Sequence, residues 1–87
     1  MKAFWYDEKR KNVCGEQIRK LRKEKGMSTK DLEIKASLSG FETLTQNAII
    51  KIELGYRFVP DYEVGFFAAL LDTTPEYLIG FPEKYVN

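Results

Sequence analysis

The sequence predicts a compact all-α domain of five short helices. Apolar residues recur at helical spacing in successive stretches, each bounded by residues typical of helix caps or stops. No stretch alternates apolar and polar residues as a half-buried strand does. The 87 residues suit one domain with a single modest core. We expect a leader over residues 1–12, the helical domain over 13–80 and a tail over 81–87.

Two helices are predicted in the first half of the chain. The first runs from about residue 13 to 25, and Gly26 ends it because glycine adopts the left-handed conformation at low cost. The second begins at Ser28, which with Asp31 matches the pattern of a capping box, and fades by Ser37. Their inward faces are assigned to Cys14, Ile18 and Leu21, and to Leu32 and Ala36 with Ile34 as a further candidate.

Three more helices are predicted in the second half. Thr45 caps the third, which ends at Gly55, and Asp61 caps the fourth. Thr74, followed by a proline suited to the first helical position, opens a short fifth helix that Gly80 closes. The inward residues are Ala48, Ile49 and Ile52; Val64, Phe67, Ala68 and Leu71; and Tyr77, Leu78 and Ile79.

Positive and negative charge are divided between the two parts of the chain. Residues 1–30 hold ten Lys or Arg and four Asp or Glu, whereas residues 31–87 hold four and nine, so +6 and −5 give the net charge of +1. Such asymmetry suggests an anionic partner for one face. The competing interpretation, which charge alone favours, is a solvated helix face.

The composition argues against an enzyme, a metal site and a membrane segment. The chain has no histidine, the commonest general base and metal ligand, and its one cysteine, Cys14, allows no internal disulfide or thiolate cluster. We interpret Cys14 as a small core residue and expect no cofactor. No apolar run approaches the ~20 residues of a membrane helix, and the N-terminus lacks a signal-peptide pattern, so we expect a cytoplasmic protein.

Three blocks in order resemble lambda-repressor-like (Xre/Cro-type) helix-turn-helix transcriptional regulators. They are residues 18–28 with Asp31 and Leu32, residues 45–57, and residues 70–78. The resemblance spans roughly residues 13–80 and implies the fold of that family. The chain departs from it at Thr29, where the family usually has glutamine, and in a longer link between the second and third helices.

The resemblance implies that the helix over residues 45–54 enters the DNA major groove. Gln46 and Asn47 are suited to bidentate contact with adenine, and the competing interpretation is that they satisfy free N–H groups near the cap. Ile50 is expected to face outward, where it would contact a thymine methyl group, and the competing interpretation is that it packs in the core or against a partner. Lys51 would reach guanine or a phosphate unless it is only solvated.

Phosphate contacts and one ion pair are also expected. The candidate phosphate contacts are Thr29, Lys30, Thr45 and Arg57, and for Arg57 the alternative is a salt bridge with Asp61 or Glu63. Lys9, Arg10 and Lys11 would form either an arm over the duplex or a mobile leader. By resemblance, Arg22 and Glu53 form a partly buried, structural ion pair.

The function expected from these features is sequence-specific binding of double-stranded DNA by a transcriptional regulator, a repressor more than an activator. A homodimer on a palindromic operator is expected, since two-fold half-sites match two-fold protein symmetry. The alternative is a protein–protein interaction module or an antitoxin component with the same fold. Phe4, Trp5 and Tyr6 are expected to pack on the body, near the fifth helix or Phe81 and Tyr85, or to join a dimer.

Overall fold

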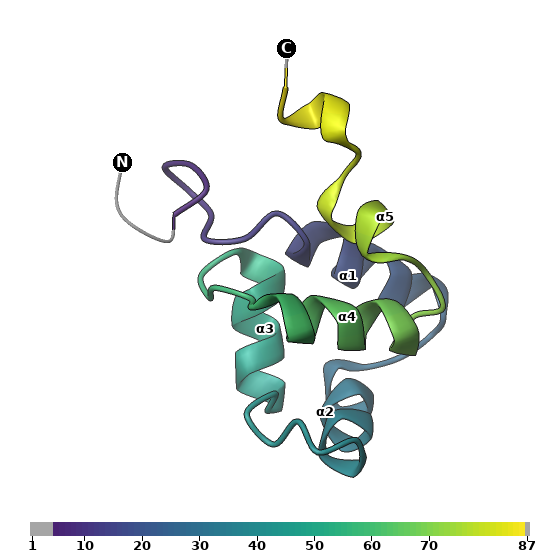
Figure 1. Ribbon diagram of the computed structural model, residues 1–87. Helices are drawn as coiled ribbons and strands as arrows, with labels where there is room; N and C mark the ends of the chain where they lie inside the picture. The colour runs from purple at the N-terminus through teal and green to yellow at the C-terminus, as the bar shows by residue number, and fades with distance from the viewer. Residues whose placement is uncertain (1–4, 87) are drawn as a thin grey trace.

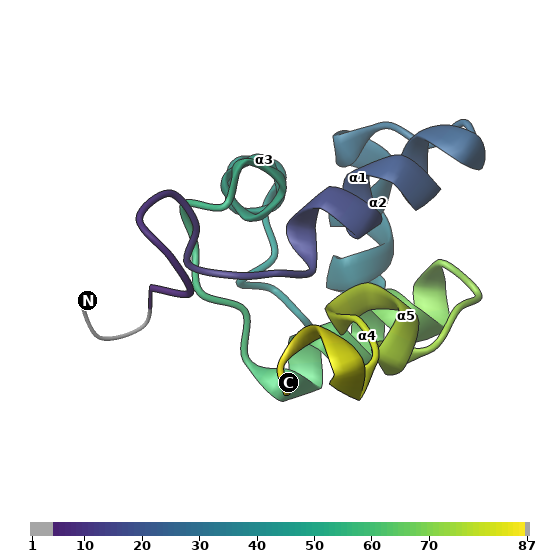
Figure 2. The ribbon, with the colours of Figure 1, turned by 90° about the horizontal axis from the view of Figure 1, so that it is seen from above.

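The computed structural model describes residues 5–86 and is all-helical, as predicted (Figure 1). It contains α1 (Gly15–Glu24), α2 (Thr29–Leu38), α3 (Gln46–Leu54), α4 (Asp61–Leu70) and α5 (Pro75–Ile79), then a 3₁₀ turn (Pro82–Lys84). The described residues include no β-strand. Seen from above, α1 and α3 lie on one side of the molecule and α4 and α5 on the other (Figure 2).

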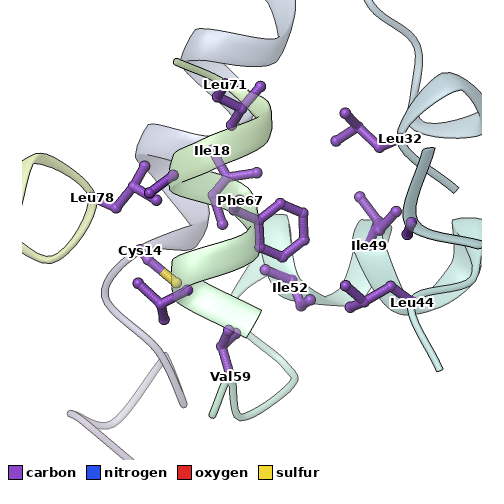
Figure 3. Close-up of a cluster of buried hydrophobic side chains, with 13 residues drawn as sticks. Cys14, Ile18, Leu32, Leu44, Ile49, Ile52, Val59, Phe67, Leu71 and Leu78 are labelled. Atoms are coloured by element: carbon purple, nitrogen blue, oxygen red, sulfur yellow. The ribbon is translucent and has the colours of Figure 1, made fainter. Parts of the chain in front are cut away.

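One cluster of buried side chains joins the helices. Phe67 of α4 is fully buried at its centre and points toward Ile49 and Ile52 of α3, with Ile18 of α1 beside it (Figure 3). The other predicted inward residues of α4 are buried as well. In α2, the candidate inward residue Ile34 is not buried, because 49% of it is exposed. It lies two residues from both Leu32 and Ala36, which is about 200° around the helix from the buried face.

The helix caps match the sequence pattern with one correction. Ser28 and Asp31 form the predicted capping box, with reciprocal bonds of 3.0 and 2.8 Å. The hydroxyl oxygen of Thr45 accepts a hydrogen bond from the backbone of α3, and that of Thr74 does the same for α5. Asp61 is not a cap, because the carbonyl of Pro60 accepts the first bonds of α4 and Asp61 becomes the first helical residue.

Cys14 is a core residue, as predicted. Its side chain is buried, and burial raises the pKa of the thiol to about 11. The thiol therefore stays protonated at neutral pH, where a reactive cysteine would need a thiolate.

The aromatic leader lies against the body. Trp5 and Tyr6 line an apolar hollow together with Phe58 and Tyr85, and the Tyr85 hydroxyl donates to the carbonyl of Ile79. Packing near α5 and Tyr85 is thus found. Phe81, which we expected to lie near the leader, is exposed. Phe4 lies outside the described residues. No helix within residues 5–86 has the length and apolar character to cross a bilayer.

Gly15 allows the start of α1 to contact the end of α3. A Cβ atom at this position would lie 2.1 Å from the carbonyl oxygen of Ile52, and any larger residue would force the two helices apart. Gly65, in the middle of α4, has open space where a Cβ would be. The two glycines therefore provide a matched pair of sites for substitution.

We expect Gly15→Ala to lower the free energy of unfolding by about 1–3 kcal/mol, the usual cost of overpacking. Gly65→Ala should raise it by about 0.5–1 kcal/mol, because alanine is the better helix former. Urea unfolding of both variants beside the wild type measures the difference. Equal stability of the two variants would contradict the close approach of α1 and α3.

Candidate nucleic-acid interface

One face of α3 is exposed and carries every residue predicted to contact bases. Gln46, Asn47, Ile50 and Lys51 are exposed, and Leu54 extends the face by another turn. At 100° per residue these five positions fall within an arc of about 140°. The opposite side carries Ile49 and Ile52, which are buried, and Glu53 is buried at the edge of the arc next to Gln46. The structure therefore gathers the predicted base contacts on a single surface, which we call the α3 face.

The start of α2 contacts the first turn of α3. Thr29 accepts a hydrogen bond of 3.1 Å from the side-chain amide of Gln46. The ammonium group of Lys30 lies 2.6 Å from the Glu33 carboxylate and lowers the pKa of that carboxyl, as does a backbone bond from Gln46. Thr29 and Lys30 thus lie beside Thr45 and the first turn of α3, and Lys30 already has a carboxylate partner.

Arg57 lies apart from these residues and has a structural role. Its guanidinium binds the carboxylate of Glu63 at 2.6 and 3.1 Å, and Glu63 is only 2% exposed. To reach a phosphate, Arg57 would leave a buried carboxylate without its charged partner, which is costly. The structure shows the salt-bridge alternative, and we no longer include Arg57 among the phosphate contacts.

The predicted ion pair between Arg22 and Glu53 is present. The Nε and Nη2 atoms of Arg22 donate to the two carboxylate oxygens of Glu53 at 2.7 and 3.0 Å. Arg22 also donates to the carbonyl of Met27, in the turn that leads to α2. The Glu53 carboxylate raises the pKa of Arg22. The pair therefore joins α1, α3 and the segment that leads into α2, and it holds Glu53 against α1.

A groove between α1 and the last turn of α3 is lined by basic side chains that we did not predict to bind a ligand. Arg19, Lys20 and Lys23 of α1 share it with Leu54, which also belongs to the α3 face. Among residues 5–86 these three cations have no carboxylate within ion-pair distance. The excess of positive charge in residues 1–30 was the sequence signal that could have indicated these residues. A solvated helix face gives the same excess, so the signal did not single them out.

The opposite side of the molecule is acidic. Residues 58–83, which include α4 and α5, contain five Asp or Glu and no Lys or Arg. Because α1 and α3 lie on the other side, basic and acidic groups are separated across the fold (Figure 2). A polyanion would therefore approach the side that carries α1 and the α3 face.

Comparison of the chain with protein-family models, with curated proteins and with solved structures gives no match. The residues that the structure describes include no group of three or more side chains able to hold a metal ion.

We expect Arg22→Ala to destabilise the fold by about 3–5 kcal/mol, because Glu53 would keep a buried, unpaired charge. Arg19→Ala, at an exposed position of the same helix, should change stability by no more than about 0.5 kcal/mol. Thermal unfolding of the two variants provides the comparison. An Arg22→Ala variant as stable as the wild type would show that the pair contributes nothing.

Proposed function

We propose that the protein binds double-stranded DNA sequence-specifically, with α2 and α3 acting as a helix-turn-helix and α3 lying in the major groove. We propose further that it works as a transcriptional regulator, acting as a repressor. The observation that carries this proposal is the α3 face, which is exposed over its whole length and has polar side chains in its first turn. It adjoins three cations that have no carboxylate partner among residues 5–86. An α-helix fits the major groove, where each base pair presents a distinct set of donors and acceptors.

The side chains of the α3 face suit base edges. Gln46 and Asn47 are in the first turn, which enters the groove most deeply in helix-turn-helix proteins, and each can pair with N6 and N7 of adenine. The bond from Gln46 to Thr29 keeps the Gln46 side chain near the DNA-facing end of α3. Ile50, one turn on, suits a thymine methyl group, and Lys51 suits guanine or a phosphate.

Phosphate contacts would lie on both sides of the groove. Thr29, Lys30 and Thr45 flank the first turn of α3, whereas Arg19, Lys20 and Lys23 flank its last turn. Such contacts set the position of the protein on the duplex without reading its sequence. The acidic α4–α5 side would face away from the DNA, which avoids repulsion by the phosphates.

We propose that two copies of the chain bind a palindromic operator. One α3 face offers few base contacts, and a two-fold dimer doubles them on two half-sites. A regulator of this kind acts where the DNA is, which is the cytoplasm in cells without a nucleus.

A protein–protein interaction module, an antitoxin component included, is the second candidate. Ile50 and Leu54 are 40% and 54% exposed on the α3 face, so part of this surface is apolar. Apolar side chains at the centre of a surface favour a protein partner. This candidate predicts that the same face binds protein and discriminates no DNA sequence.

We expect the wild type to select a palindromic site from random duplex DNA. Gln46→Ala/Asn47→Ala should lose that selectivity and keep weak, salt-sensitive binding, since each bidentate contact contributes about 1–3 kcal/mol of discrimination. Titration of selected and random duplexes measures this, and Gln17→Ala on α1 is the control. If no duplex binds the wild type better than about 10⁻⁴ M, the interaction module becomes the preferred function.

We expect Lys20→Ala to weaken binding to all duplexes alike and to reduce the slope of log affinity against log salt by about one, because one phosphate contact is lost. Lys84→Ala, in the turn beyond α5, should leave the slope unchanged. Binding to a single duplex at four or more salt concentrations gives the slopes. Equal slopes for both variants would place the duplex away from the α1 groove.

A further inference from the structure

The segment Arg10–Asn12 wraps the C-terminal end of α3. The backbone N–H of Lys11 donates to the carbonyl of Gly55 at 2.7 Å. The side-chain amide of Asn12 donates to the carbonyls of Ile52 and Arg57, at 3.0 and 2.9 Å. The last carbonyls of a helix have no partner within the helix, so bonds from another segment can hold them in place.

Asn12 is the centre of this arrangement. It is 7% exposed, and both its donor hydrogens and its oxygen are used, because the oxygen accepts from the N–H of Gly15 at 2.9 Å. One side chain thus joins the first residue of α1, the last turn of α3 and the link to α4. Aspartate has the same shape but has no amide hydrogen to donate.

Arg10 adds a positive charge at the same place. Its Nη2 atom donates to the carbonyl of Glu53 at 3.1 Å, at the negative end of the α3 dipole. The Arg10 side chain lies over Gly55, where a Cβ atom would come within 2.8 Å of the guanidinium carbon. Gly55 has φ of +87°, so glycine is favoured here by its backbone as well as by this contact.

The connection between α2 and α3 makes this restraint important. Seven residues, 39–45, separate the two helices, so a tight turn does not determine the direction of α3. The first turn of α3 is held by Gln46 and Thr29, and the last turn by Glu53 and Arg22. The bonds from residues 10–12 act on the same last turn. They come from the segment that precedes α1.

We propose that Arg10–Asn12, which we name the α3 clamp, determines DNA specificity by positioning the second half of α3 without contacting DNA. The clamp holds the turn that carries Lys51 and Leu54, and so sets the angle at which the α3 face enters the groove. This inference rests on the proposed function. It assigns Asn12 and Arg10 as positioning residues, and it replaces the arm or mobile leader that the sequence suggested.

The test compares Asn12→Asp with Gln17→Glu, which makes the same amide-to-carboxylate change at a half-buried position of α1. Two properties are measured under conditions where both variants are folded: hydrogen exchange at the amides of Gly55 and Tyr56, and the ratio of affinities for selected and random duplexes. In Asn12→Asp we expect faster exchange at both amides and a ratio reduced about tenfold, comparable to the loss of one base contact. The salt slope should equal that of Gln17→Glu.

Arg10→Met is the second variant, since it retains the central Asn12 and the apolar stem of residue 10. We expect the same changes, smaller in size, with an unchanged salt slope. A slope reduced by about one in Arg10→Met would show that Arg10 contacts a phosphate, which overturns the proposal. An unchanged affinity ratio in both variants would also overturn it.

Failure of the proposed function gives a different result. If the wild type binds no duplex, DNA binding itself is refuted and the specificity claim falls with it. Hydrogen exchange at Gly55 and Tyr56 still reports whether the clamp holds α3, because that measurement needs no DNA. Slow exchange that persists in Asn12→Asp would refute the clamp whether or not the wild type binds DNA.

Discussion

The arrangement of this protein depends on one pair of charges held out of water, Arg22 and Glu53. A buried carboxylate is tolerable only when it is paired and hydrogen-bonded, and both oxygens of Glu53 are bound by Arg22. This requirement fixes the last turn of α3 against α1. With Ile49 and Ile52 in the core, helical spacing turns Asn47, Ile50 and Lys51 outward. The exposed face of α3 is thus a consequence of how its opposite face is packed, and the ion pair holds the last turn in that orientation.

A second set of polar restraints surrounds the same end of α3. Asn12 and Arg10 bind carbonyls of the last turn, and Gly15 lets the backbone of α1 approach them. In the link that follows α3, Arg57 neutralises Glu63, which is almost fully buried. The charged side chains with structural partners are therefore concentrated around α3. Arg19, Lys20 and Lys23 of α1 are exposed to solvent, next to the surface that we propose reads DNA.

Local features of the fold could be predicted from the sequence because they depend on neighbouring residues. The caps at Ser28, Thr45 and Thr74 each bind a backbone group three residues away, and the inward positions repeat within one or two turns. The exposed face of α3 followed from the same spacing. The start of α4 was predicted one residue too late. Asp61 is the better capping residue by its side chain, yet the carbonyl of Pro60 accepts the first bonds of the helix.

The sequence by itself determined five helices, their approximate ends, most of the core positions and the outward face of α3. Only the tertiary structure decided that Arg57 pairs with Glu63, that Asn12 joins two helices, and that residues 10–12 are part of the folded body. The physical reason is distance along the chain. Asn12 and Ile52 are forty positions apart, and an amide has many possible partners in a sequence. In the folded protein, the Asn12 amide can bond only to those carbonyls that the fold brings within about 3 Å.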